Sequence, residues 1–388
     1  MVIHVDLAHK CSPSYSVSVT VSVGTAISVG TSAVVLLMAS CSDWTETESV
    51  NIKYPDLKAD APELYEQYMQ SLRDYRDSDH KVVIAKFDNK ATSPAGQAEH
   101  INALPDSIDY VILQNPDNLS SEIQAEMKEV RAVKGMKVLY EISCSSIIAS
   151  YKAYLEEWNA AHPETTASEG EGETPSEPVE NPTSQNDFVK NAVAEQLGLF
   201  AKYGYDGINV SYTTKNPLSV PEDKQPELLA EQEAFLEGIR EWRKSNADAS
   251  FFYEGTPQYL LNEDMSLIKG ADYIIIPALS EQNLSSFSYL VNQALRFGNI
   301  PADKFVVSVT TVSLTDPGDT KGTFIDKDDN GNVLTAITGA AYWTTQKTSG
   351  VTKAGICIPN VQNDYFNIQF VYPNVRKAIA IMNPSPLN

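Results

Sequence analysis

The chain has 388 residues, of which 42% are hydrophobic and 9% aromatic, enough for one large domain or two ordinary ones with a sizeable core. The formal net charge is −22 and the pI is about 4.6. A field of that sign repels phosphate backbones and anionic lipid head groups, so nucleic-acid binding and membrane docking through a basic patch are both disfavoured.

The four cysteines, Cys11, Cys41, Cys144 and Cys357, are spaced too widely for a metal-binding CxxC pair. The five histidines are scattered along the chain, so we expect neither a metal nor another cofactor. A chain of this size builds its own core without disulfides, and Cys144 and Cys357 are therefore predicted to be plain buried thiols.

The N-terminus carries features of an export signal. Residues 27–39 form an apolar run that is too short to span a bilayer comfortably. The segment 38-MASC-41 resembles a bacterial lipobox, and the acidic stretch 42-SDWTETE-48 resembles the export signal of Bacteroidetes surface lipoproteins. We therefore expect residues 1–40 to be a signal segment, Cys41 to be lipidated, and the protein to be exposed at the outer membrane surface. The alternative is an ordinary thiol in an uncleaved segment.

Residues 60–76 carry apolar and aromatic side chains at helical spacing, which predicts a helix packed across one end of the following domain. Strands and helices then alternate. The predicted strands are 81–87, 108–115, 136–143, 205–212, 249–254, 271–278, 304–312 and 353–359. The predicted helices are 119–135, 146–161, 186–202, 226–245, 257–268, 284–297, 339–347 and 364–382. Alternation implies a parallel sheet, and eight units indicate an α/β fold of the closed (β/α)8 TIM-barrel type. A doubly wound open sheet is the alternative, but no glycine-rich turn follows the first strand.

Two segments interrupt the alternation. Residues 162–185 hold six Glu, four Pro and no Lys or Arg, which predicts a disordered loop inserted in the helix layer. Residues 313–338 are predicted to be irregular, with a hairpin signal at Asn330-Gly331. The stretch 326–333 resembles the start of a calcium loop but lacks the final glutamate. The predicted organisation is a signal at 1–40, a lipid-anchored leader and packing helix at 41–76, and a barrel at 77–384.

The end of the fourth strand, 206-DGINVSYT-213, is the most informative stretch. Period-two spacing places positions 209, 211 and 213 on one face of the strand, pointing into the carboxyl end of the barrel, where active sites of this fold lie. The stretch resembles the fourth strand of glycoside hydrolase family 18, the chitinases and endo-β-N-acetylglucosaminidases, which reads D-G-x-D-x-D-x-E.

The resemblance implies that the catalytic acids are replaced. Asn209, Ser211 and Thr213 stand at the three acidic positions that follow the Asp-Gly pair. In the family the glutamate protonates the glycosidic oxygen, and the neighbouring aspartate orients the substrate's acetamide. Neither a hydroxyl nor an amide can serve as that general acid. Two further family features are absent. The tyrosine that binds the acetamide after the sixth strand is missing from the end of 272-DYIIIPALS-280, where Pro277 and Leu279 stand. The tryptophan of the eighth strand is missing from 355-GICIPNVQND-364.

Other polar and aromatic side chains are predicted near the same end of the barrel. Glu141 and Glu254 could support ordinary acid/base hydrolysis if their carboxylates lay about 5–9 Å apart, or could simply be hydrogen-bonded inside the barrel. The predicted glycan-binding residues are Asp88, Gln114, Glu141, Asn209, Ser211, Tyr212, Thr213, Glu254, Trp343 and Gln362.

Three classes of function follow. The first is a non-catalytic, cell-surface glycan-binding protein for N-acetylglucosamine-containing glycans such as N-glycans, working beside importer and glycosidase proteins of a glycan-utilisation system. The second is an active endo-β-N-acetylglucosaminidase, or another glycoside hydrolase with a non-standard acid. The third is a structural or protein-binding lipoprotein, which a barrel mouth plugged by residues 313–338 would favour.

Overall fold

The computed structural model describes residues 57–384, except 91, 163–180, 262–263, 298, 317 and 367–369. The predicted signal segment, Cys41 and the start of the leader lie outside the described residues, as does most of the acidic insert. Within the described part of the chain, no helix is long and apolar enough to cross a bilayer.

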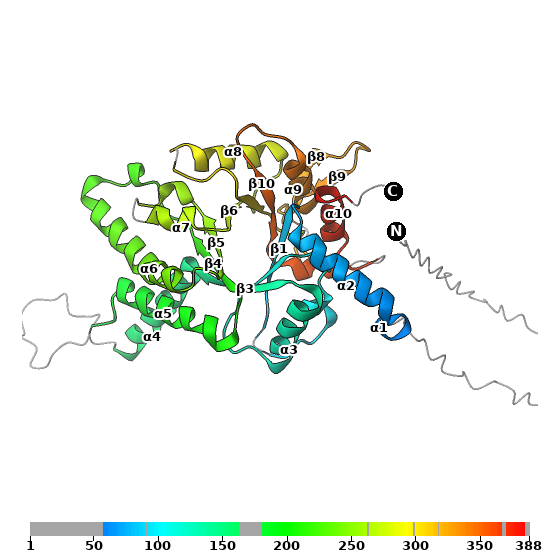
Figure 1. Ribbon diagram of the computed structural model, residues 1–388. Helices are drawn as coiled ribbons and strands as arrows, with labels where there is room; N and C mark the ends of the chain where they lie inside the picture. Colours follow the sequence, from blue (N-terminus) through cyan, green and yellow to red (C-terminus); the bar gives the residue numbers. More distant parts are fainter. Residues whose placement is uncertain are drawn as a thin grey trace, which may run out of the picture.

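Eight parallel strands close into a barrel in the order β1-β10-β7-β6-β5-β4-β3-β2 (Figure 1). The strands are β1 (Val82–Phe87), β2 (Tyr110–Leu113), β3 (Lys137–Ser143), β4 (Gly207–Tyr212), β5 (Ser250–Gly255), β6 (Tyr273–Pro277), β7 (Phe305–Ser308) and β10 (Lys353–Ile358). The predicted (β/α)8 barrel is confirmed, and each strand lies within or close to its predicted range.

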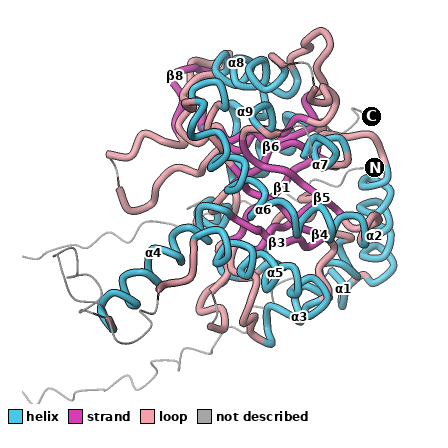
Figure 2. Tube along the Cα trace, turned by 90° about the vertical axis from the view of Figure 1, so that its left-hand side faces the viewer, coloured by secondary structure: helices cyan, strands magenta, loops and turns pink. Residues whose placement is uncertain are grey.

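The helices surround the strands (Figure 2). They are α1 (Leu57–Asp60), α2 (Pro62–Asp77), α3 (Ser121–Glu129), α4 (Cys144–Ala161), α5 (Gln185–Tyr203), α6 (Gln225–Ser245), α7 (Met265–Lys269), α8 (Leu284–Leu295), α9 (Ala336–Thr345) and α10 (Pro373–Met382). Helix α2 packs across the amino-terminal end of the barrel, as predicted. Its Arg76 Nη2 donates to the carbonyls of Asp106 and Ile108, just before β2, at 2.6 and 2.8 Å.

Two predicted helices were wrong in extent. Residues 257–268 form only a short 3₁₀ turn at Pro257–Tyr259 and the helix α7. The predicted helix at 364–382 begins only at Pro373, because proline has no N–H to donate and fits the first turn but not the interior of a helix.

The segment 313–338 contains an antiparallel hairpin, β8 (Thr323–Lys327) and β9 (Val333–Thr335). The Asp328 carboxylate accepts the backbone N–H groups of Asn330 and Asn332 at 3.0 and 2.9 Å, which fixes the turn. The hairpin packs on the start of α8, where Leu284 N donates to Asp326 Oδ2 at 2.7 Å. Among the described residues, no cluster of His, Cys, Asp or Glu could hold a metal ion.

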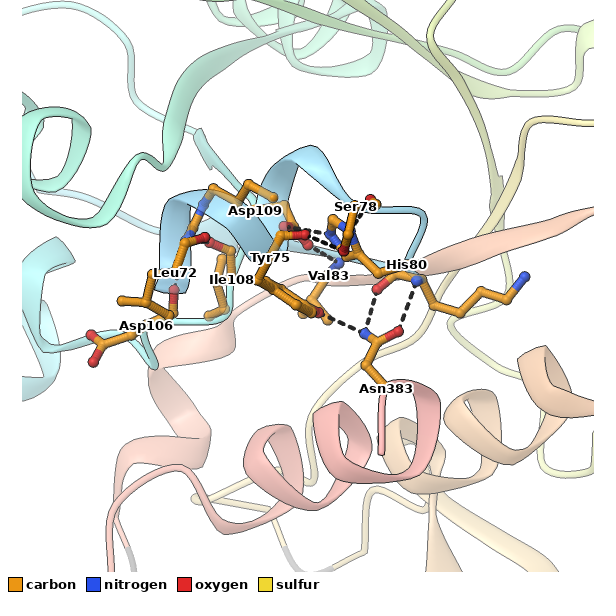
Figure 3. Close-up of polar contacts among 11 residues, drawn as sticks. Leu72, Tyr75, Ser78, His80, Val83, Asp106, Ile108, Asp109 and Asn383 are labelled. Carbon is orange, nitrogen blue, oxygen red and sulfur yellow. Dashed lines mark hydrogen bonds and ion pairs between the residues drawn. The ribbon is translucent and has the colours of Figure 1, made fainter. Parts of the chain in front are cut away.

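An aspartate stands immediately before each of β2, β4 and β6. Its carboxylate accepts the backbone N–H at or near the start of the preceding strand. The pairs are Asp109 with Val83 N (2.8 Å; Figure 3), Asp206 with Val138 N (2.7 Å) and Asp272 with Phe251 N (2.9 Å). These bonds tie neighbouring strands together at the amino-terminal end of the barrel, so Asp206 has a structural role at the opposite end from the mouth.

Candidate functional site

The inside of the barrel changes from apolar to polar toward its carboxyl end, which we call the mouth. The apolar part is formed by Val82, Ile84, Ile112, Leu139, Phe252, Ile275, Val306 and Cys357. One period-two step further along four of the strands come Lys86, Glu141, Asn209 and Glu254, which we call the polar layer. Glu141 pairs in register with Asn209, and Glu254 with Ser211.

Lys86 joins the two glutamates of the polar layer. Its Nζ lies 2.8 Å from Glu141 Oε2 and 2.9 Å from Glu254 Oε2. Asn209 Nδ2 donates to the same Glu254 oxygen at 2.9 Å. The Lys86, Glu141 and Glu254 side chains are 6%, 10% and 6% exposed, so water screens these ion pairs poorly.

Burial and charge act on the polar layer in opposite directions. Burial lowers the pKa of Lys86, but attraction to Glu254 and Glu141 outweighs it, and the pKa is raised overall. Burial raises the pKa of Glu141, while Lys86 and a hydrogen bond with Ser211 oppose the shift without cancelling it. The ammonium therefore stays charged, while the raised pKa of Glu141 favours the protonated form of its carboxyl.

Strand β4 needs the glycine of its Asp-Gly pair, because a Cβ at Gly207 would lie 1.9 Å from the carbonyl oxygen of Ser250. Beyond it the side chains follow the predicted alternation. Asn209 is fully buried in the barrel, Ser211 is half-buried, and Thr213 is exposed at the mouth.

A cavity of about 420 Å³ lies beside Thr213, between β4 and the start of α4. Ser145, Ser211 and Thr213 contribute hydroxyls to its wall, and Ile148 and Ala149 contribute apolar surface. The Ser145 hydroxyl is held 3.0 Å from that of Ser143, which also caps α4. Hydroxyls beside apolar carbon suit a sugar, which presents both kinds of surface.

A second polar group gathers on the rim formed by the ends of β1, β2 and β10. Asn115 Nδ2 donates to Asp88 Oδ1 at 3.0 Å, and Asp88 N lies 3.5 Å from Gln362 Oε1. Gln114 lies next to Asn115 and is half-buried. The structure thus places three predicted site residues, Asp88, Gln114 and Gln362, at the mouth.

The structure does not bring Tyr212 and Trp343 to the mouth. The Tyr212 side chain is 5% exposed and stacks on Phe235 of α6, on the outside of the barrel. Trp343 is 1% exposed, and its indole donates to Ser288 Oγ at 3.0 Å inside the helix layer. A sugar cannot stack on either ring in this arrangement, because both rings are covered by core side chains.

Sequence reasoning missed Lys86 and Ser145. Lys86 could have been found from its place in an otherwise apolar strand, at an inward period-two position. A buried ammonium there requires a partner of opposite charge. Ser145 offered no comparable signal, because serines at the start of a helix are ordinary capping residues.

The class of protein is therefore a closed (β/α)8 barrel with a polar mouth, in which Asp206 precedes and Gly207 begins the fourth strand. The chain belongs to glycoside hydrolase family 18, BT1044-like, whose family model matches residues 45–381. No curated protein matches the chain.

Two solved structures support the fold. A selenomethionine form of BT1044 with a glutamate-to-glutamine substitution is 22% identical, with a TM-score of 0.55, 84% of this chain covered and 95% of that one. An endo-β-N-acetylglucosaminidase from Cordyceps militaris is 14% identical, with a TM-score of 0.51 and coverage of 82% and 96%.

Proposed function

We propose that the protein binds a glycan at the barrel mouth without hydrolysing it. The observation that carries the proposal is the position of Lys86, whose ammonium lies within 2.9 Å of both barrel glutamates. A carboxylate held in a buried ion pair is a poor general acid, because giving it a proton breaks the pair. The family's own acid position is occupied by Thr213, which has no transferable proton at a useful pKa.

The ligand we propose is an N-acetylglucosamine-containing glycan such as an N-glycan. Family membership supports this class, and the cavity beside Thr213 supplies hydroxyls and apolar carbon to receive it. The proposed setting is the cell surface, where lipidated Cys41 anchors the chain to the outer membrane beside importers and glycosidases.

The second candidate is a hydrolase that uses Glu141. Burial raises the pKa of this carboxyl, and its side chain is 10% exposed. Both properties suit a general acid.

The test is calorimetric titration of the full chain with a high-mannose N-glycan and with chitin oligomers, followed by mass spectrometry of the same mixtures. We expect binding with the glycan intact. Ala149→Trp, which fills the cavity beside Thr213, is expected to weaken binding at least about tenfold, or about 1.4 kcal/mol. Ala153→Trp, one turn further along α4 and outside the cavity wall, is the matched control.

Cleaved product that disappears in Glu141→Gln would overturn the non-catalytic proposal and establish the hydrolase. Absence of both binding and cleavage would instead favour a structural or protein-binding lipoprotein.

A further inference from the structure

A cavity of about 780 Å³ lies at the amino-terminal end of the barrel, opposite the mouth. Helix α2, residues 105–107 before β2, and helix α10 form its walls, and we call it the amino-end cavity. Its volume falls within the range of about 300–1,000 Å³ that is usual for small-molecule sites. Neither the polar layer nor the cavity beside Thr213 contributes to it.

Two tyrosines of α2 line the amino-end cavity. Tyr68 is 41% exposed, and its hydroxyl donates to Asp106 Oδ2 at 2.8 Å, which fixes the ring. The Tyr75 hydroxyl accepts a bond from Asn383 Nδ2 at 2.8 Å (Figure 3). Asn383 is held in turn by both backbone groups of Lys81, at 2.8 Å each. The wall is therefore preorganised, and the exposed Tyr68 ring offers an apolar face beside polar groups.

Two charged side chains that have hydrogen-bonding atoms unused by the described residues also line the cavity. Arg376 is exposed; its Nε donates to Val371 O at 3.0 Å, and its terminal amino groups make no hydrogen bond to any described residue. The exposed Asp79 carboxylate likewise accepts no hydrogen bond within the described part of the chain. The cavity thus offers free donors and free acceptors together.

The charges around the cavity balance. Both ring nitrogens of His80 face acceptors, Ser78 O at 2.8 Å and Asp109 Oδ1 at 2.9 Å, an arrangement that favours the doubly protonated, positively charged ring. His80 pairs with Asp109, and Asp106 pairs with Lys134 Nζ at 2.9 Å. Arg376 and Asp79 are then the charges of the wall that have no ion pair with a described residue, and they are of opposite sign. A balanced wall does not select a charged ligand. It suits a neutral molecule with many hydroxyls and an apolar ring face.

We propose that the amino-end cavity is a second binding site, which takes a neutral oligosaccharide stacked on Tyr68 and hydrogen-bonded to Arg376 and Asp79. The inference does not rest on the function proposed for the mouth, because the two sites share no residue.

The test combines saturation-transfer difference NMR with calorimetry on the full chain. The probes are the neutral tetrasaccharides of glucose (α- and β-linked), mannose and N-acetylglucosamine. At least one is expected to bind, with Tyr68→Ala weakening that binding about tenfold and Tyr68→Phe, which keeps the ring, changing it less than about threefold. Tyr289→Ala is the control: Tyr289 lies on α8 outside the cavity and is more exposed than Tyr68, 63% against 41%. Arg376→Ala, which removes the proposed donor, is likewise expected to weaken that binding. Lys377→Ala, which removes the adjacent exposed cation outside the cavity wall, is its control.

The variant Ala149→Trp separates the two sites. Binding that survives Ala149→Trp and is lost in Tyr68→Ala supports the second site. Binding that is lost in Ala149→Trp and unchanged in Tyr68→Ala overturns it, while leaving the mouth proposal intact. Failure of all four probes to bind at Tyr68 also overturns it.

Discussion

Lys86 Nζ lies 2.9 Å from Glu254 Oε2 across the inside of the barrel, and both side chains are 6% exposed. A charged network thus lies between the mouth and the apolar part of the barrel interior. Such a network gives little net stability when complete, but it is very sensitive to the loss of one member.

Lys86→Met is therefore expected to lower the free energy of unfolding by about 3–5 kcal/mol at pH 7, because Glu141 and Glu254 are left buried without a counter-charge. Urea unfolding measures the change. The triple variant Lys86→Met, Glu141→Gln, Glu254→Gln removes all the charges and should recover most of the loss. Equal midpoints for Lys86→Met and wild type would show that the ion pairs are not formed.

His80 should make stability depend on pH. The hydrogen bond to Asp109 raises its pKa above the ordinary value of about 6.5. Because the folded state holds the proton more tightly, the stabilisation is complete below about 6.5 and is lost as pH rises through the folded pKa. Urea unfolding between about pH 5 and 9 should show stability falling across this window.

His80→Gln is expected to flatten that part of the profile, since no proton is then released there. Asp109→Asn should flatten it as well, because the carboxylate that favours the imidazolium is gone. A slope that persists unchanged in both variants would mean that another group titrates.

The fold could be predicted from the sequence because the alternation of strands and helices and the β-branched runs of buried strands are local patterns. Eight such parallel units form few architectures other than a closed barrel. The errors fell where a local residue cut an element short, as Pro373 does for α10. The mouth was readable along β4, where period two alone places Asn209 and Ser211 inside.

Contacts between strands that are far apart in the chain could not be predicted from the sequence. Lys86 meets Glu254 only because β1 and β5 lie across the same barrel, and the two residues are 168 positions apart in the chain. For Tyr212 and Trp343, aromatic character alone could not separate a core ring from a sugar platform. The structure shows that both are core rings: Tyr212 is buried against Phe235, and Trp343 is buried beside Ser288.

Gly207 should not tolerate a side chain. The Cβ of Gly207→Ala would lie 1.9 Å from Ser250 O, on the backbone of the adjacent strand, so one strand must move. We expect a loss of more than about 4 kcal/mol or failure to fold. Gly198→Ala is the matched control: it lies within α5 with nothing within 4 Å of its Cβ, and should stabilise by about 0.5–1 kcal/mol. Similar midpoints for the two variants would contradict the tight β4–β5 approach.

Asn209→Asp is expected to destabilise the protein unless a second position is changed with it. Its amide donates to Glu254 Oε2 at 2.9 Å and is fully buried, so Asn209→Asp replaces a donor by a like charge. A loss of at least about 2 kcal/mol at pH 7 is expected from the broken bond and the added repulsion. Adding Glu254→Gln supplies an amide that can donate to the new carboxylate, and should restore most of the stability. Urea unfolding of the two single variants and the double variant gives the coupling between the positions. Strictly additive effects would mean that Asn209 and Glu254 act independently, and that the Asn209–Glu254 contact is not what keeps an acid out of this position.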